Sequence, residues 1–308
     1  MEARECTRQY LLALALVGIF SAATAFAQDL EPRAYSASPI GLNFIVVGGG
    51  HSTGGVVVDP SGPVQDVEAT TNVASLGIGR TFGLFGRTAL IVAALPYAWA
   101  EASGRIGEES RTTSRSGLAD PRLRFSVNLI GGRAMKVQEF VRTKRSTIVG
   151  VSLAVAPPFG QYDRSKLINL GANRWSFKPE AGISRNIGEK WTIDGYAGVL
   201  FFTANEQYYP GFSVRTQDPI FAFQAHASYT LKPRFWTAFD ATWYSGGTTI
   251  IDGTSSGILQ RNSRVGATLS VPITREQSLK FAVSKGATTR IGSNFTTVSG
   301  AWQLTWFN

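Results

Sequence analysis

The stretch FAFQAHASYTL, residues 221–231, alternates strictly between two kinds of side chain. Its odd positions are all apolar or aromatic, whereas its even positions are mostly polar and include His226 and Ser228. Successive side chains of a β-strand point to opposite faces, so the pattern predicts a strand with one apolar and one polar face. The apolar face of such a strand must meet either a protein core or lipid.

The same two-residue rhythm recurs along most of the chain. Twelve strands are predicted, starting near residues 41, 70, 87, 119, 146, 174, 191, 218, 234, 261, 277 and 296. Strands of about ten residues are long enough to cross a bilayer when they are tilted. Downstream of residue 27, no run of 18 or more apolar residues is present, which excludes a helical membrane protein.

The connections between the predicted strands alternate between short and long. Four are tight, at 83–87, 188–190, 232–234 and 274–277. Five are longer and polar, at 51–68, 105–117, 159–173, 205–218 and 245–260. Short turns on one side and long loops on the other are typical of outer-membrane barrels. The segment 131–145 is an exception, because it is long for a turn on the short side.

The N-terminal region has the three parts of a secretory signal peptide. Arg4 and Arg8 precede an apolar segment at 10–27, and Ala25-Phe26-Ala27 forms a small-x-small cleavage site. We therefore expect a signal peptide at 1–27 and a barrel domain at 28–308, although a membrane anchor is the alternative for the first segment. Cleavage would remove Cys6, the single cysteine, so no disulfide or thiol chemistry is expected.

Charge and residue usage narrow the classes of partner. The formal net charge is +9, which is compatible with nucleic-acid binding, but an exported chain is better matched to lipopolysaccharide, anionic lipid or anionic solutes. No nucleic-acid partner is therefore expected. The chain has two histidines, His51 and His226, so neither a metal site nor a cofactor is predicted.

These patterns together predict an all-β protein, a transmembrane antiparallel up-and-down β-barrel of about twelve strands, in the bacterial outer membrane. In lipid, every backbone polar group must be paired internally, so an all-strand protein has to close its sheet. Aromatic residues at strand ends, such as Phe221 and Tyr229, fit girdles at the two membrane interfaces. A soluble antiparallel sandwich also alternates and remains the alternative fold.

The last strand carries a biogenesis signal. In VSGAWQLTWFN, Val298, Trp302, Leu304 and Trp306 alternate with polar residues. This resembles the C-terminal strand that the barrel-assembly machinery of the outer membrane recognises. Such strands usually end on an aromatic residue, whereas this one ends on Asn308.

From about Leu30 to Trp306 the chain resembles a family of outer-membrane proteins named for the meta-pathway of phenol degradation. The resemblance rests on EPRAYSASPIGLNF, LPYAWAEASG, GLADPRLRFSVNLIG, VGVSLAVAPPFGQYD, LINLGANRWSFKPEAGIS, GYAGVLFFTAN and AWQLTW. It covers nearly all of the chain after the signal. The resemblance implies a transporter-like barrel and does not imply an enzyme of phenol breakdown.

The polar faces of the predicted strands supply candidate residues inside the barrel. The candidates for lining or selectivity are Arg122, Arg124, Lys178, Glu180, Asp194, His226, Asp240 and Lys280. Charges at membrane depth pair with one another or meet water, so these residues can form a structural network. They can equally form a ring that selects solutes by charge. The two interpretations are compatible.

Two further constellations have competing interpretations. Tyr162, Tyr208, Tyr209 and Phe212 lie in predicted loops, where they can capture apolar or aromatic solutes or pack the loops over the barrel mouth. His226 and Ser228 share a strand face and raise the alternative of a lipid hydrolase. Their predicted inward orientation, and the absence of an Asn-Gly pair after the serine, favour a polar pair lining the interior.

We therefore expect a channel or transporter for passive uptake of small-molecule solutes, with apolar or aromatic molecules as one candidate class. No catalytic residue and no enzyme activity are predicted. The first alternative is a plugged barrel with a structural or surface-interaction role, and the minor alternative is the lipid hydrolase.

Overall fold

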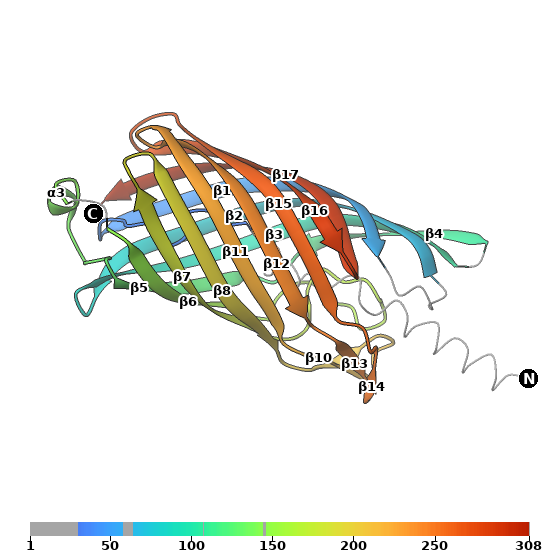
Figure 1. The fold of residues 1–308 in the computed structure, drawn as a ribbon. Coiled ribbons are helices and arrows are strands. Elements are labelled where there is room, and N and C mark those ends of the chain that lie inside the picture. The colour runs from blue at the N-terminus through green and yellow to red at the C-terminus, as the bar shows by residue number, and fades with distance from the viewer. Residues whose placement is uncertain (1–29, 58–63, 107, 144–145, 308) are drawn as a thin grey trace, which may run out of the picture.

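The computed structural model describes residues 30–57, 64–106, 108–143 and 146–307, and nearly all of its regular structure is β-strand (Figure 1). The predicted signal peptide at 1–27 lies outside the described residues. The helix that the structure describes is α3 (Val137–Phe140). No helix in the described part of the chain is long and apolar enough to span a membrane.

The strands follow one another around a single large sheet, with a small second sheet inserted in two connections. The strands of the large sheet are β1 (Leu42–Val57), β2 (Val64–Leu84), β3 (Arg87–Ile106), β4 (Glu109–Leu118), β5 (Arg122–Ile130), β6 (Ile148–Ala156), β7 (Ser176–Ile187), β8 (Trp191–Phe202), β11 (Ile220–Lys232), β12 (Phe235–Gly246), β15 (Gln260–Pro272), β16 (Gln277–Thr289) and β17 (Gly292–Phe307).

The large sheet closes into a twelve-stranded antiparallel barrel. Strand β1 pairs with β17 from Leu42↔Phe307 to Val57↔Gly292, which joins the first strand to the last. Strands β4 and β5 share one position, because both pair with β3 at different heights. The large sheet therefore has twelve positions around the barrel, and the predicted fold class and strand number are confirmed.

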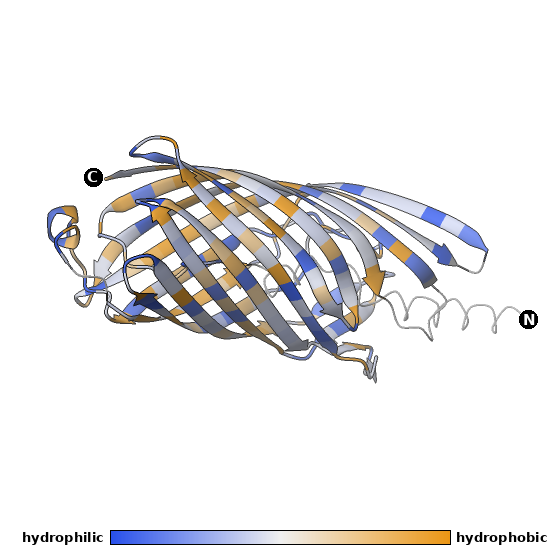
Figure 2. Ribbon diagram, turned by 45° about the horizontal axis from the view of Figure 1, so that its top comes forward, coloured by the Kyte–Doolittle hydropathy of each residue, from blue (hydrophilic) through white to orange (hydrophobic). Residues whose placement is uncertain are grey.

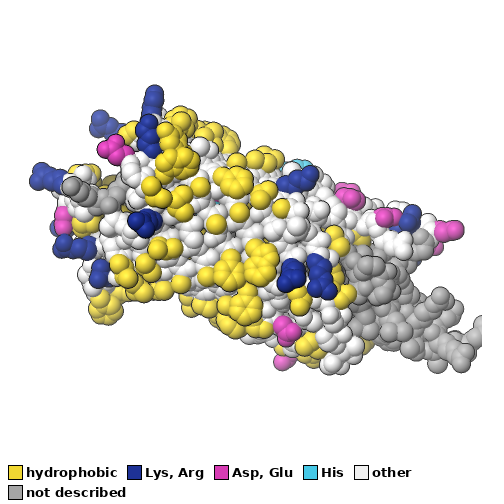
Figure 3. Space-filling view, viewed as in Figure 1, with side chains coloured by type: hydrophobic (Ala, Val, Ile, Leu, Met, Phe, Trp, Pro, Cys, Tyr) yellow, Lys and Arg dark blue, Asp and Glu magenta, His cyan; other side chains and the backbone are white. Residues whose placement is uncertain are grey.

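Burial alternates along the strands as the sequence predicts. In β11, Phe221 and Phe223 are about half exposed, whereas Gln224, His226 and Ser228 are buried. In β12, Phe239 is 61% exposed and its neighbour Asp240 is 0% exposed. A two-sheet sandwich would bury those aromatic rings, so the exposed apolar band rules that fold out (Figures 2 and 3).

Two predicted loops are wrong, because the barrel strands continue into them. The segment 51–68 contains the end of β1 and the start of β2, and 105–117 is mostly the hairpin of β3 and β4. In the extensions of β1 and β2, polar residues such as Thr53 and Glu68 lie on the exposed face, whereas Val56 and Val67 are buried on the other face. The exposed face is thus polar instead of apolar, which removes the pattern of a membrane strand although strand pairing continues.

The remaining long connections gather at the end of the barrel away from the tight turns, here called the long-loop end. A four-stranded sheet lies there, formed by β9 (Asn205–Tyr208), β10 (Ser213–Gln217), β13 (Thr249–Ile251) and β14 (Thr254–Ser255). Tyr208 and Ile251 form its buried core with Leu167 and Tyr209. The long loops of this end are thus held by their own packing.

The opposite end, here called the short-turn end, carries the tight turns and the chain end at β17 (Figure 1). Phe85 and Gly86 connect β2 and β3 with φ values of 48° and 75°. Two successive residues of positive φ match the twist of a tight hairpin. The exceptional segment 131–145 contains the single-turn helix α3, which explains its length.

Strand β4 differs from the other strands of the wall, because a barrel strand pairs with it on one side and a loop contacts it on the other. This strand pairs with β3 on one side, and the connection between β6 and β7 lies on its other side. Gln161 N donates to Leu118 O at 2.7 Å. A side chain at Gly117 would collide with Gln161, because a Cβ there would lie 1.7 Å from Gln161 Oε1. Glycine at this position lets the connection lie flat against β4.

Candidate functional site in the barrel lumen

Four of the predicted interior charges are neighbours on the inner wall. Arg124 on β5 contacts Glu180 on β7 at 3.4 Å, and Lys178 Nζ contacts the other oxygen of Glu180 at 2.7 Å. Lys178 and Glu180 are two residues apart on one strand, so their side chains share the inner face. Arg122, which is half-buried, lies two residues before Arg124 on the same face.

A second group lies on β8, β11 and β12, where the register places Asp194, His226 and Asp240 opposite one another. His226 Nδ1 and Asp240 Oδ1 are 2.7 Å apart, and Thr268 Oγ1 donates to Asp240 Oδ2 at 2.6 Å. Lys280 faces the lumen on β16, with its ammonium 5.9 Å from the ring centre of Trp236. The structure thus brings the predicted interior residues together as a mostly paired network.

The segment before the first strand, residues 30–41, lies inside the barrel and completes this network. It is called the N-terminal segment below. Glu31 Oε2 forms an ion pair of 2.5 Å with Arg124 Nη1. Arg33 N donates to Asp194 Oδ2 at 3.2 Å, and Ala34 N donates to Tyr196 Oη at 3.0 Å. Backbone and side chains of the segment are both bound to the wall.

Tyr35 anchors the N-terminal segment in a cradle made by glycine. Its ring lies over Gly150 and Gly182, where an added Cβ would come within 2.5 Å and 2.4 Å of the ring atoms. Its hydroxyl lies 2.9 Å from Ser152 Oγ and donates to Glu180 Oε1 at 3.1 Å. The lumen wall is therefore shaped to receive this one side chain.

Sequence analysis did not identify the N-terminal segment as part of the site. Two signals in the sequence point to it. Gly150 and Gly182 occupy inward positions of their strands and leave a space that another residue must fill. Glu31 and Arg33 are charged residues in the short stretch that precedes the first strand, and inside a barrel such charges need partners.

The opposite side of the lumen is lined by small residues. Gly48 and Gly50 point inward on β1, and Ser75 and Ser299 flank them on β2 and β17. The atoms nearest to a Cβ added at Gly48 or Gly50 belong to the adjoining strands, not to the N-terminal segment. Ser75 and Ser299 are partly exposed although they face inward. This side of the lumen is therefore accessible to solvent.

The four loop aromatics predicted to capture solutes differ in their surroundings. Tyr208 is buried in the loop sheet, and Tyr209 packs beside it. Tyr162 Oη donates to Gln207 O at 3.0 Å, which ties two loops together. Phe212 is 70% exposed. Three of the four thus hold the loops in place, and Phe212 is free of that packing.

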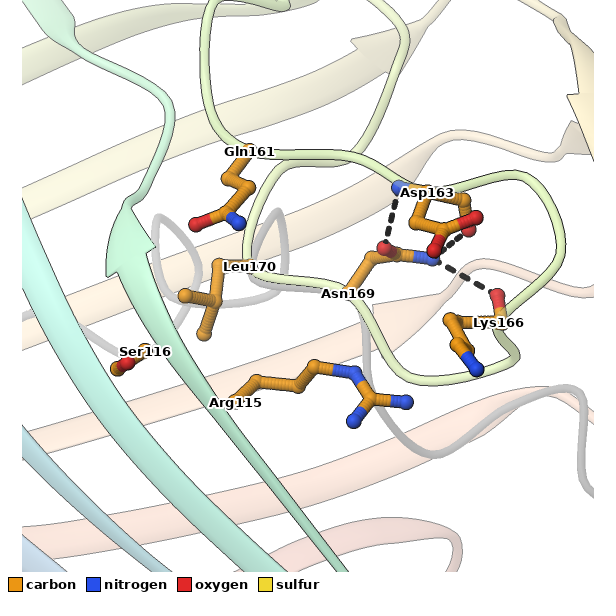
Figure 4. Close-up of a pocket in the computed structure, with 7 residues that line it drawn as sticks. All are labelled: Arg115, Ser116, Gln161, Asp163, Lys166, Asn169 and Leu170. Carbon is orange, nitrogen blue, oxygen red and sulfur yellow. Dashed lines mark hydrogen bonds between the residues drawn. The ribbon is translucent and has the colours of Figure 1, made fainter.

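A small pocket of about 200 Å³ opens between β4 and the connection 157–175 at the long-loop end (Figure 4). Asn169 accepts from Asp163 N at 2.8 Å and donates to Lys166 O at 2.8 Å, so its amide is used to hold the loop. Arg115 Nε donates to Ile168 O at 3.1 Å. The pocket's lining residues are Arg115, Ser116, Gln161, Asp163, Lys166, Asn169 and Leu170.

The His226 and Ser228 pair does not face lipid. Both side chains lie in the barrel interior, where they are 2% and 0% exposed. The imidazole is oriented by Asp240, but Ser228 Oγ has no hydrogen-bond partner among the described residues. A membrane lipid has no access to this serine from the outer wall. In the described part of the chain, no three His, Cys, Asp or Glu residues are grouped to hold a metal ion.

Comparison with known proteins identifies one family and several solved structures of similar fold. The family model described as "Putative MetA-pathway of phenol degradation" matches residues 48–302. The crystal structure of an outer membrane channel from Pseudomonas putida F1 has a TM-score of 0.75 and 21% identity, covering 90% of this chain and 100% of that one.

Two autotransporter barrels of lower sequence identity also have a fold similar to that of this chain. The transport unit of the autotransporter AIDA-I from Escherichia coli has a TM-score of 0.51 and 13% identity, with 93% and 96% of the two chains covered. The β-domain of the Bordetella autotransporter BrkA has a TM-score of 0.52 and 9% identity, with 86% and 99% covered. No curated protein matches the sequence.

Proposed function

Given that this chain belongs to the family described as "Putative MetA-pathway of phenol degradation", we propose that it is an outer-membrane channel for small molecules. Solutes would move passively between the long-loop end and the short-turn end. The family description and the similarity to an outer membrane channel from Pseudomonas putida F1 support this role. The phenol pathway in the family's description makes apolar or aromatic solutes the first class to test.

The observation that carries the proposal is the unequal lining of the lumen. The N-terminal segment and its network fill the side formed by β5 to β12, as the burial of Tyr35, Lys178 and Glu180 shows. The side formed by β17, β1 and β2 presents small, partly exposed residues such as Ser75 and Ser299. A narrow route along this wall would pass small solutes and exclude large ones.

The test is conductance and solute flux through the purified protein in planar bilayers and liposomes. Gly50→Trp should reduce both several-fold, because the new ring points into the route. A Cβ at Gly50 meets its nearest neighbour at 3.4 Å, so the substitution is compatible with the backbone. Val47→Trp is the matched control, since Val47 faces outward and is 50% exposed. Equal effects of both substitutions would contradict the proposed route.

A second candidate function is a closed barrel with a structural role. The paired charges around Glu180 and the cradled Tyr35 favour it, because a satisfied interior is also what a plug requires. The intact mature protein would then show neither conductance nor flux of phenol or sugars. If current appears only after the N-terminal segment is removed, the closed barrel is the better description.

We propose the same surroundings for the protein as for other outer-membrane barrels. Cleavage after Ala27 would free the mature chain, and the barrel-assembly machinery would recognise β17, whose Val298 and Trp306 face outward. The short-turn end would face the periplasm, as in barrels of this class. Lipid and lipopolysaccharide would surround the exposed apolar band.

A further inference from the structure

Two buried arginines lie at the long-loop end, above the lumen. Arg174 belongs to the connection between β6 and β7 and is 3% exposed, and Arg215 lies on β10 and is 7% exposed. In β10, Ser213, Arg215 and Gln217 alternate with more exposed residues, so the three share one face. Arg174 Nη2 donates to Gln217 Oε1 at 2.5 Å, so its guanidinium approaches the face that carries Arg215.

Arg174 has no acidic partner in the part of the chain that the structure describes. Its buried Nη1 atom has no hydrogen-bond partner there either. Among the described residues, no carboxylate lies within ion-pair distance of it. The carboxylate of Asp120, the acid that acts on it electrostatically, accepts Gly160 N and Ala172 N, both at 2.8 Å. A buried guanidinium without a counter-charge is costly, so the arrangement calls for an anion.

The electrostatics agree with this geometry. Burial, and then the positive charge of Arg215, lower the pKa of Arg174 well below its usual value. Burial also lowers the pKa of Arg215. An anion beside Arg174 would offset both the burial of its charge and the repulsion from Arg215.

Apolar groups surround the same place. The guanidinium of Arg174 lies 4.3 Å from the ring centre of Phe202. Phe202 packs on a buried inner cluster that includes Leu200, Ile220 and Tyr244. A ligand held by Arg174 would therefore keep its charged end at the guanidinium and meet an apolar surface at Phe202.

We propose that Arg174, together with Arg215, forms a binding subsite for the carboxylate of an apolar or aromatic acid. The planar fork of a guanidinium matches the two oxygens of a carboxylate. The proposal rests on the proposed channel function, because it names the class of solute that the long-loop end would receive. Benzoate is the simplest probe that has both the ring and the carboxylate.

The experiment measures equilibrium binding to the purified mature protein in detergent by titration calorimetry. Benzoate is compared with phenol, which has the ring without a carboxylate at neutral pH, and with acetate, which has the carboxylate without the ring. Arg174→Gln should weaken benzoate binding by about tenfold or more and leave phenol unchanged, since a charged hydrogen bond is lost. Arg174→Lys keeps the charge without the fork and should lose less.

The control is Arg105→Gln. Arg105 is at the same end of the barrel, but its partner is Asp66 at 2.8 Å and it is exposed. It should leave benzoate binding unchanged, and strand content of each variant is checked by circular dichroism. Benzoate binding that is absent, or equal in the wild type and Arg174→Gln, would overturn the subsite.

Liposome flux of benzoate and phenol separates this proposal from the channel itself. Benzoate binding that depends on Arg174, with no flux of either solute, would support the subsite and contradict the channel function. If Arg174→Gln changes neither the flux of the two solutes nor the binding of benzoate, the subsite is contradicted and the channel function is not.

Discussion

Tyr35 lies where the N-terminal segment meets the barrel wall, and both its ring and its hydroxyl contact residues of the wall. The ring rests on two glycines and meets Tyr196 edge-on, with ring centres 5.1 Å apart. The hydroxyl reaches Ser152 and Glu180. Strand glycines normally weaken a sheet, so their use here is explained by the close approach of this ring.

We predict that Tyr35→Ala increases single-channel conductance, because removing the ring unfastens the N-terminal segment from the wall. The barrel itself should stay folded, since its strand pairing does not involve Tyr35. Tyr35→Phe is the matched control, which keeps the ring and loses only the hydroxyl contacts. Conductance that is the same in all three proteins would show that the segment is not held by this residue.

Arg124 holds two carboxylates from different parts of the chain, Glu31 and Glu180. Arg124→Gln should lower the free energy of unfolding by about 1–3 kcal/mol, a value below that of a fully buried pair because Glu31 is 46% exposed. Urea titration in detergent measures the change. The expected cause is the loss of the counter-charge of Glu31, because Glu180 keeps its ion pair with Lys178 at 2.7 Å.

A double substitution checks that cause. Adding Glu31→Gln to Arg124→Gln removes the unpaired acid, so the double variant should recover part of the lost stability. Additive losses in the two single variants would contradict a direct interaction between these side chains.

At the scale of elements, the N-terminal segment behaves as a separable part of the lumen. It is bound by side chains and short backbone contacts, such as Arg33 N to Asp194, and it adds no strand to the barrel. Strands β1 and β17 close the barrel by themselves through sixteen paired positions. The segment therefore affects the width of the lumen more than the existence of the barrel.

We predict that a variant lacking residues 30–40 forms the same barrel and conducts more current than the intact mature protein. The deletion removes Glu31 and leaves Arg124 and Lys178 beside Glu180, which should shift selectivity towards anions. Reversal potentials in a salt gradient measure this shift. A deletion variant with unchanged conductance would mean that the segment does not limit passage.

At the scale of the whole molecule, positive charge is concentrated at the short-turn end (Figure 3). The exposed basic residues there are Arg80, Arg133, Lys136, Arg142, Arg185, Lys190, Lys232, Arg234 and Arg275, against the exposed acids Glu139, Glu189 and Glu276. At the long-loop end, two exposed arginines pair with acids, Arg105 with Asp66 and Arg111 with Glu109. The net charge of +9 is therefore unevenly distributed.

This distribution predicts that anionic phospholipid on the short-turn side stabilises the barrel, at about 1 kcal/mol per basic side chain near the surface. The urea midpoint should be higher in vesicles containing phosphatidylglycerol than in phosphatidylcholine alone. Arg133→Glu with Lys136→Glu should reduce the difference, whereas Arg111→Glu at the other end should not. A urea midpoint that is the same in both kinds of vesicle for every variant would refute the prediction.

Several of these features follow from the order of residues alone. The period of two in segments such as 221–231 determines which side chains face lipid and which face inward, because neighbouring residues of a strand point to opposite faces. For this reason the twelve strands and the inward orientation of His226 and Asp240 could be predicted without coordinates. The strand ends beyond the membrane could not, because their exposed face is polar and lacks the apolar residues of a membrane strand.

Pairing between distant residues was decided only by the tertiary structure. Glu31 meets Arg124, and Tyr35 meets Gly150 and Gly182, because closure of the barrel brings a segment outside the strand pattern into the lumen. Periodicity reports the face of a residue and carries no information about what crosses the lumen to meet it. The sequence by itself thus determined a β-barrel with an apolar outer surface and a polar interior. How that interior is filled on one side and left accessible on the other depends on contacts between residues far apart in the chain.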